Sequence, residues 1–314
     1  MGARYHKVAI VGAGAVGLYY GGRLASTYND VHFLLRSDYD HVAREGLLIE
    51  SIAGDARLKS IHCAQRSEDI GPVDLVIVAW KATSNAHYKK VVTPLLGSRT
   101  HILTLQNGLG NVECLAELFG AWRVFGGLCF VCINRIGPGH VRHSASGLVR
   151  VGKYQPGETD ELSSLVEFLR RAKIECQGVD NLEKAQWMKL VWNVPFNGLA
   201  VSEGGVDTEK LLAIPGMEQR IMRIMSEIQQ AAAKFGHTIE DAFLERQIGI
   251  TRPMKAYRPS SMIDYIEGRE VEVDAIWGEP LRRARELGVA MPEMERLLGE
   301  IEQRLAQRDV NDHN

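Results

Sequence analysis

Apolar positions along the chain follow two different periods. Short apolar runs, including 8–11, 31–35 and 73–79, alternate with segments of helical spacing as far as about residue 178. Such runs are typical of parallel strands buried on both faces, and strands that alternate with helices build an open α/β sheet. Beyond that point the apolar spacing is almost entirely helical. We therefore predict an α/β domain over residues 1–178 and an all-helical domain over residues 179–314.

The first apolar run leads into a glycine-rich turn, Gly12-Ala13-Gly14-Ala15-Val16-Gly17. Gly12 lets the chain turn sharply at the end of the strand, and Gly17 lets the following helix pack closely against it. Gly14 has no side chain, so a pyrophosphate can reach the backbone at the helix N-terminus, where N–H groups favour anions. Because the turn lies between a strand and a helix, we predict that all six residues bind a dinucleotide in a domain of the Rossmann type. An ordinary structural turn is the alternative.

The residue after the second predicted strand indicates which dinucleotide is bound. In this architecture an acidic residue about 20 positions beyond the glycines binds the ribose of NAD, whereas a basic residue accommodates the 2′-phosphate of NADP. Arg36 lies 19 residues after Gly17 and is followed by Ser37. We therefore predict NADPH (NADP) as the cofactor. Asp38, close by, leaves NAD as the alternative.

Polar residues also follow two later strands. Lys81 comes after the run 73–80, and Asn107 lies in the turn 106–111 after the run 101–105. Ligands of open α/β sheets bind beyond the carboxyl ends of the strands. We therefore expect Lys81 to face the cofactor and Asn107 to reach nicotinamide or substrate. A solvated lysine and an ordinary Asn-Gly turn are the alternatives.

The first helix of the helical domain, about residues 181–200, carries a polar stripe. Lys189, Asn193 and Asn197 are spaced by four, which places them on one helical face with a drift of about 40° per step. Two of the three are amides rather than solubilising charges, so the stripe can bind a carboxylate and hydroxyl groups. A solvated face is the alternative. Pro195 lacks the N–H of other helical residues, so we expect it to kink this helix.

Composition and charge argue against several classes of partner. The net charge is −2 without a long basic run, which argues against nucleic acid. No apolar run approaches the ~20 residues of a membrane span, and the early first strand leaves no room for a signal peptide, so we expect a cytoplasmic protein. The five cysteines include Cys129 and Cys132, which lie in a strand-like run without paired histidines nearby. We expect reduced thiols and no metal site.

Taken together, these motifs resemble the ketopantoate reductase family over essentially the whole chain. The matching segments are the glycine turn 12–17, Lys81, the turn 105–110, the stripe of Lys189, Asn193 and Asn197, Ser260-Ser261-Met262, and the segments 271–274 and 281–288. The resemblance implies an NADPH-dependent 2-dehydropantoate 2-reductase of pantothenate and coenzyme A biosynthesis. It also implies that NADPH and a small 2-oxo acid bind between a Rossmann domain and a helical domain.

The resemblance implies a role for each polar position. Lys189 would protonate the carbonyl oxygen as hydride reaches C2, and Glu272 would lie near Lys189, tune its protonation and contact the cofactor. The implied substrate ligands are Asn193, Asn197, Ser261 and Asn107, while Lys81 and Asn107 would bridge cofactor and substrate and Arg36 would bind the 2′-phosphate. From local sequence alone, Ser261 would instead be a helix N-cap and Glu272 an acidic residue of a first helical turn.

Two departures from the family pattern bear on the substrate. Asp207 stands where the family often has a further substrate-binding asparagine, ten residues after Asn197. At that substrate position its carboxylate would repel a 2-oxo acid unless it is protonated, paired or turned away. The interval from Ser261 to Glu272 is one residue shorter than is usual. Reduction of a different 2-oxo acid is therefore one alternative. NADPH sensing without turnover is a second, against which the polar set of Lys189, Asn193, Asn197 and Ser261 argues, because a sensor needs no proton donor. A homodimer is one assembly that we consider.

Overall fold

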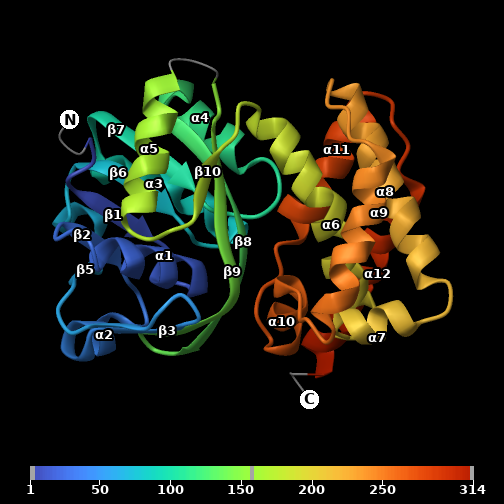
Figure 1. The fold of residues 1–314 in the computed structure, drawn as a ribbon, viewed down its shortest axis with the longest axis horizontal. Helices are drawn as coiled ribbons and strands as arrows, with labels where there is room; N and C mark the ends of the chain where they lie inside the picture. The colour runs from blue at the N-terminus through green and yellow to red at the C-terminus, as the bar shows by residue number, and fades with distance from the viewer. Residues whose placement is uncertain (1–3, 156–158, 312–314) are drawn as a thin grey trace. The chain divides into compact units, whose positions relative to one another are not determined.

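The computed structural model describes residues 4–155 and 159–311, which form two compact units (Figure 1). The first unit comprises Met1–Gln106 and Asn111–Leu182, and the second comprises Asn107–Gly110 and Glu183–Asn314. The short turn 107–110 therefore belongs to the helical unit, although it follows a strand of the α/β unit in the chain. Each unit has its own buried core.

The α/β unit is built on one ten-stranded sheet in the described part of the chain. In spatial order its strands are β4 (Ala56–Leu58), β3 (Leu47–Ser51), β9 (His140–Lys153), β8 (Val124–Gly137), β7 (Leu96–Thr104), β6 (Val73–Val78), β1 (Val8–Val11), β2 (Val31–Leu34) and β5 (His62–Ala64), and β10 (Cys176–Gly178) pairs with β9. The central strand β1 pairs in parallel with β2 and β6, so that Val8 lies opposite Val31 and Leu75. The predicted α/β sheet is confirmed, and β8 and β9 add a long antiparallel hairpin to it.

Helices and single turns connect these strands. The helices are α1 (Ala15–Ala25), α2 (Tyr39–Glu45), α3 (Tyr88–Val92), α4 (Asn111–Phe119) and α5 (Thr159–Arg171), and the 3₁₀ turns are η1 (Ser67–Asp69), η2 (Ala82–His87), η3 (Thr93–Leu95) and η4 (Ala121–Arg123). The segment after β6 is divided among η2, α3 and η3 rather than forming one helix. Pro94 lies within η3, where it supplies no backbone N–H, so α3 ends just before it.

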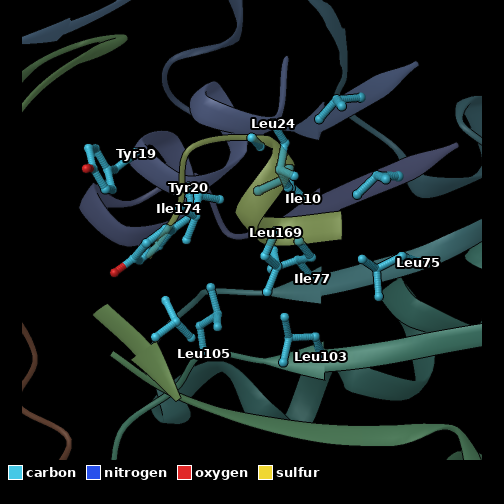
Figure 2. Close-up of a cluster of buried hydrophobic side chains, with 14 of the residues drawn as sticks. Ile10, Tyr19, Tyr20, Leu24, Leu75, Ile77, Leu103, Leu105, Leu169 and Ile174 are labelled. Carbon is cyan, nitrogen blue, oxygen red and sulfur yellow. The ribbon is translucent and has the colours of Figure 1, made fainter. Parts of the chain in front are cut away.

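The core of the α/β unit lies between the sheet and the helices α1 and α5. Ile10, Ile77 and Leu103 from three neighbouring strands pack in one cluster with Leu24 of α1 and Leu169 of α5 (Figure 2). All five side chains are almost fully buried. Alternate residues of a strand point to opposite faces, and the intervening strand residues are buried as well. Burial on both faces explains why the central strands are unbroken apolar runs.

The helical unit surrounds one central helix, α6. Its elements are α6 (Leu182–Ser202), α7 (Thr208–Ala213), α8 (Met217–Lys234), α9 (Asp241–Thr251), η5 (Arg252–Met254), α10 (Ser260–Ile266), the π-helical η6 (Asp274–Gly278), α11 (Glu279–Glu286) and α12 (Pro292–Asn311). Residues 194–202 of α6 are all buried, and α6 continues through Pro195. The indole of Trp277 donates to the carbonyl of Val194 at 3.1 Å, next to that proline. No helix among the described residues is long and apolar enough to cross a membrane.

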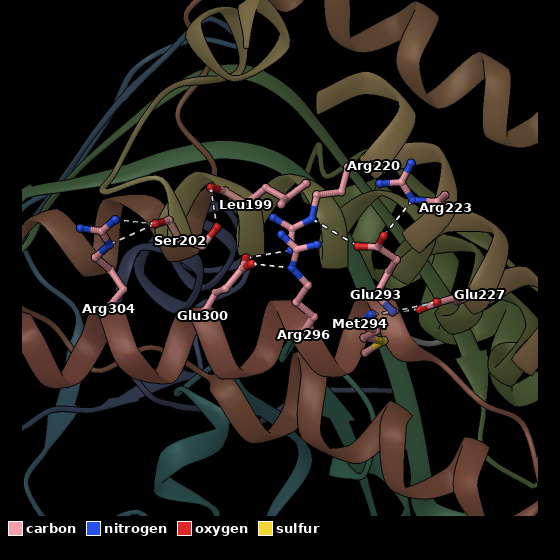
Figure 3. Close-up of polar contacts among 10 residues, drawn as sticks. All are labelled: Leu199, Ser202, Arg220, Arg223, Glu227, Glu293, Met294, Arg296, Glu300 and Arg304. Atoms are coloured by element: carbon pink, nitrogen blue, oxygen red, sulfur yellow. Dashed lines mark hydrogen bonds and ion pairs between the residues drawn. The ribbon is translucent and has the colours of Figure 1, made fainter. Parts of the chain in front are cut away.

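Ion pairs and helix caps hold α6, α8 and α12 together (Figure 3). The carboxylate of Glu227 on α8 accepts the backbone N–H groups of Glu293 and Met294 at 2.8 and 2.9 Å, which satisfies donors at the start of α12. Burial raises the pKa of Glu227 above its ordinary value. Further along α12, the guanidinium of Arg304 donates to the carbonyl of Ser202 at 2.8 and 3.0 Å. The Arg304 bonds join α12 to the last turn of α6, the helix that carries the polar stripe.

Candidate active site

The glycine turn of the α/β unit is a close strand-to-helix connection. Gly12 has a φ of +96°, and a Cβ at this position would lie 2.2 Å from the backbone nitrogen of Trp80. A Cβ on Gly17 would lie 2.0 Å from the carbonyl oxygen of Gly12. Both contacts are with backbone atoms, so neither position has room for a side chain. The turn therefore requires glycine at its first and last positions for packing alone.

Gly14 differs from the other two glycines because it is exposed to open space. A Cβ built on Gly14 meets no described atom within 4 Å. Gly14 is the N-cap of α1 and forms no side-chain capping bond. The first turn of α1 lies wholly within the described residues and contains no acidic side chain. The N–H groups and the positive end of the helix dipole therefore point to a space that suits an anion. These features fit the pyrophosphate of a dinucleotide.

Arg36 and Asp38 lie in different surroundings. Arg36 lies just beyond β2, is exposed, and has no ion-pair partner among the described residues. Asp38 is buried, and its carboxylate accepts hydrogen bonds from the guanidinium of Arg135 and from the backbone N–H of Gly139, the latter at 3.1 Å. Both oxygens of Asp38 are thus engaged within the protein, whereas Arg36 is open to a ligand.

Lys81 lies at the start of η2, three residues after the end of β6. Its side chain is half-buried. Because β1 and β6 are parallel neighbours, their carboxyl ends meet at the same edge of the sheet. Lys81 and the glycine turn therefore lie along one edge of the α/β unit, where ligands of such sheets bind.

A network of amides holds the end of β7 in the same unit. The Oε1 of Gln106 accepts from the hydroxyl of Tyr88, and its Nε2 donates to Asn85 Oδ1 at 2.8 Å. Asn85 Nδ2 donates in turn to Asn111 Oδ1 at 2.7 Å. These bonds fix both ends of the turn 107–110. Gln106 and Asn111 lie in the turn 106–111 that the sequence singled out, but their contacts with Tyr88 and Asn85 were not predicted, because those two residues belong to no motif.

In the helical unit, the ammonium of Lys189 donates to Asn107 Oδ1 at 2.8 Å. Asn107 belongs to the turn 107–110, which is anchored in this unit because the N–H of Leu109 donates to the carbonyl of Ala275 at 2.9 Å. The two residues are 82 positions apart in the chain. The structure therefore brings together two of the predicted site residues, an ammonium and an amide oxygen.

Asn197 is enclosed by polar contacts of its own. It is 2% exposed, its Oδ1 accepts the backbone N–H of Ser261 at 2.9 Å and the hydroxyl of Ser260 at 3.4 Å, and its Nδ2 donates to the carbonyl of Asn193 at 3.0 Å. The solvated-face alternative is therefore wrong for this residue. The N-cap of α10 is Pro259, so the alternative role of Ser261 as an N-cap is also wrong. Asn197 instead joins α6 to the start of α10.

Glu272 is a buried carboxylate, 8% exposed, on the segment between α10 and η6. It precedes the helix, so its alternative assignment to the first helical turn is wrong. Asp274 occupies that turn and accepts from Arg282 Nη1 at 2.6 Å, a bond that lowers the pKa of Asp274 below its ordinary value. Asp274 is thus engaged with a surface arginine, while Glu272 lies inside the unit.

Asp207 is the N-cap of α7. Its Oδ1 accepts the backbone N–H of Lys210 at 2.9 Å, and its Oδ2 lies 3.8 Å from Lys210 Nζ. The side chain of Lys210 is 74% exposed, so this ion pair contributes little. Capping nevertheless accounts for a carboxylate at this position, because it satisfies an N–H at the start of α7. One oxygen of Asp207 is therefore held by a backbone N–H, while its weak ion pair does not cancel its negative charge.

The two units together define a class of protein. The Rossmann-type sheet with its glycine turn and the helical unit with a lysine beside an amide are the parts of a dinucleotide-dependent oxidoreductase. Residues 8–156 match the family described as Ketopantoate reductase PanE/ApbA, and residues 181–304 match its C-terminal region. The chain belongs to the ketopantoate reductase family.

Similar proteins agree with this assignment. A 2-dehydropantoate 2-reductase from Nostoc sp. is 38% identical, with 92% of each chain covered. The crystal structure of a 2-dehydropantoate 2-reductase from Geobacter metallireducens has a TM-score of 0.92 at 42% identity, covering 95% of this chain and 99% of that one. A D-mandelate dehydrogenase with NADH and anilino(oxo)acetate has a TM-score of 0.89 at 23% identity, covering 96% and 99%, which shows a shared fold. The predicted Rossmann-type and helical domains are confirmed.

Proposed function

We propose that this protein reduces 2-dehydropantoate (ketopantoate) to pantoate with NADPH. The observation that carries the proposal is the 2.8 Å contact from the Lys189 ammonium to Asn107 Oδ1, in a chain of this family. Hydride addition to a ketone builds negative charge on the carbonyl oxygen. A positioned ammonium can stabilise that charge and then supply the proton that completes the alcohol. The names of the relatives supply the substrate.

Each site residue has a part in the proposed mechanism. When bound, the reduced nicotinamide supplies the hydride that reaches C2 of the substrate. Lys189 protonates the carbonyl oxygen, and Asn107 orients the Lys189 ammonium by accepting one of its N–H groups. Glu272 would help to keep Lys189 protonated, because a nearby carboxylate favours the charged form of a lysine. The proposed substrate ligands are Asn107, Asn193, Asn197, Ser261 and Asp207, and the proposed cofactor ligands are residues 12–17, Arg36, Lys81, Asn107 and Glu272.

The preference for NADPH over NADH is part of the proposal. It is supported by the exposed Arg36 beyond β2 and by the engagement of Asp38 with Arg135. A free carboxylate at Asp38 would favour NAD, whereas an exposed guanidinium suits the 2′-phosphate of NADP. The domain boundary near residue 178, a cytoplasmic location and a homodimer stay predictions.

The proposed function is tested by following NADPH oxidation with ketopantoate, with pyruvate and 2-oxoisovalerate as comparison substrates. We expect rapid oxidation with ketopantoate and slow oxidation with the other two acids. Rapid turnover of another 2-oxo acid, with ketopantoate inert, would assign the protein to a different substrate and make Asp207 the first residue to examine. Tight NADPH binding with no turnover of any acid would indicate a sensor.

Replacing Asn197 by alanine should raise the KM for ketopantoate and leave the Kd for NADPH unchanged. The substitution leaves the buried N–H of Ser261 without its acceptor, which costs about 1–3 kcal/mol in the free energy of unfolding. It also releases the start of α10, which carries Ser261, and for this we expect a rise in KM of about tenfold. If Asn197 acts only by positioning Ser261, the double variant Asn197→Ala/Ser261→Ala should be no worse than Ser261→Ala alone. Multiplying effects in steady-state kinetics would instead show that the two residues bind the substrate independently.

A further inference from the structure

An acidic residue lies close in sequence to the proposed phosphate-binding arginine. Asp38 follows Arg36 by two positions, in the segment where NAD-binding members of this architecture carry their ribose-binding acid. A free carboxylate there opposes a 2′-phosphate by charge repulsion. The protein would then present an attractive and a repulsive group to the same phosphate.

The structure neutralises this carboxylate with an arginine from the β8–β9 hairpin. Arg135 lies 97 positions further along the chain; its Nε donates to Asp38 Oδ2 at 3.2 Å and its Nη2 donates to Oδ1. The N–H of Gly139 and the hydroxyl of Ser37 add two more bonds, each of 3.1 Å. All of these residues belong to the α/β unit, so the arrangement is complete within it.

The two partners of the ion pair differ in exposure. The side chain of Asp38 is 5% exposed, whereas that of Arg135 is 40% exposed. The carboxylate is therefore enclosed with its oxygens satisfied, and the guanidinium that cancels its charge reaches the surface. A paired guanidinium and carboxylate present no net charge to an approaching phosphate, so the positive charge of Arg36 is left to act on it.

We propose that Arg135 is a specificity-determining residue, which favours NADPH over NADH by neutralising Asp38 beside the 2′-phosphate site. The inference rests on the proposed NADPH-dependent function. Arg135 acts through Asp38 and is a positioning residue rather than a ligand of the phosphate. Its removal uncovers a negative charge, which weakens binding of a ligand with a 2′-phosphate and leaves a ligand without one nearly unaffected.

The test measures binding of 2′,5′-ADP and 5′-AMP to the full-length protein by isothermal titration calorimetry. These two probes differ by the 2′-phosphate and need no turnover. We expect Arg135→Gln to weaken 2′,5′-ADP by about tenfold and to leave 5′-AMP within about twofold, as expected for one uncovered charge at short range. Asp38→Asn/Arg135→Gln should restore the affinity for 2′,5′-ADP. Thermal unfolding of each variant checks that the fold is intact.

The remaining outcomes distinguish a failure of the proposed role of Arg135 from a failure of the proposed NADPH preference. Unchanged 2′,5′-ADP affinity in Arg135→Gln, or equal weakening of both probes, would overturn the role of Arg135. If Arg135→Gln weakens 2′,5′-ADP binding and the added Asp38→Asn does not restore it, Arg135 binds the phosphate itself. That result also overturns the proposal that Arg135 acts through Asp38. Arg36→Ala tests the phosphate site independently: if it leaves the preference for 2′,5′-ADP unaltered, the NADPH assignment fails, whatever Arg135 does.

Discussion

Lys189→Ala should lower kcat for ketopantoate reduction by about 10²- to 10⁴-fold, the range typical of losing a general acid. The Kd for NADPH should stay nearly unchanged, because Lys189 is not among the proposed cofactor ligands, and the glycine turn and Arg36 belong to the other unit. Stopped-flow single turnover would measure the hydride step, and fluorescence titration would measure NADPH binding. Lys234→Ala is a matched control, because that lysine is exposed and lies on a helix, α8, that does not carry the polar stripe.

Lys189→Arg separates the two effects that the ammonium is proposed to have. An arginine keeps the positive charge, so it can still stabilise the alkoxide, but its pKa above about 12 makes it a poor proton donor. We expect Lys189→Arg to be more active than Lys189→Ala and far slower than the wild type. Equal loss of turnover and of NADPH affinity in Lys189→Ala would show that Lys189 is structural and would remove it from the mechanism.

Local sequence predicted those parts of the site whose chemistry is contained in a few consecutive residues. The turn 12–17 is such a part, because the strand end and the close helix each restrict one glycine, and the exposed Gly14 fits the anion site proposed there. The polar stripe on α6 is another, because helical spacing alone places Lys189, Asn193 and Asn197 on one face. Helical spacing could not predict how deeply these side chains are buried. Asn197 is 2% exposed because the rest of the helical unit surrounds α6, which its own sequence does not show.

The contacts that sequence did not predict join distant segments. Lys189 meets Asn107 across 82 positions, and Arg135 meets Asp38 across 97. Such pairs depend on how the sheet is ordered and on which unit the turn 107–110 joins, and neither is encoded in local periodicity. Asp38 is an example. Its position in the sequence is typical of a carboxylate that binds ribose, but in the structure its carboxylate is paired with Arg135.

Alanine substitutions at two glycines of the turn 12–17 should each have a large effect, on protein stability at Gly17 and on NADPH affinity at Gly14. Gly17→Ala brings a Cβ to 2.0 Å from a backbone oxygen, so the helix must shift, at a cost of about 1–3 kcal/mol or more in the free energy of unfolding. Gly14→Ala places its methyl group in open space at an ordinary φ of −76°. It should therefore fold with nearly wild-type stability and bind NADPH at least about tenfold more weakly, a loss of ~1.4 kcal/mol.

Chemical denaturation and NADPH titration of the two variants separate packing from ligand binding. The expected pattern is a large loss of stability for Gly17→Ala and a large loss of affinity, with stability retained, for Gly14→Ala. Gly299→Ala is the control, because a Cβ on Gly299 of α12 also meets no described atom within 4 Å. Unchanged NADPH affinity in Gly14→Ala would mean that the pyrophosphate does not lie over the start of α1. The anion site would then have to be sought elsewhere along the sheet edge that carries Lys81.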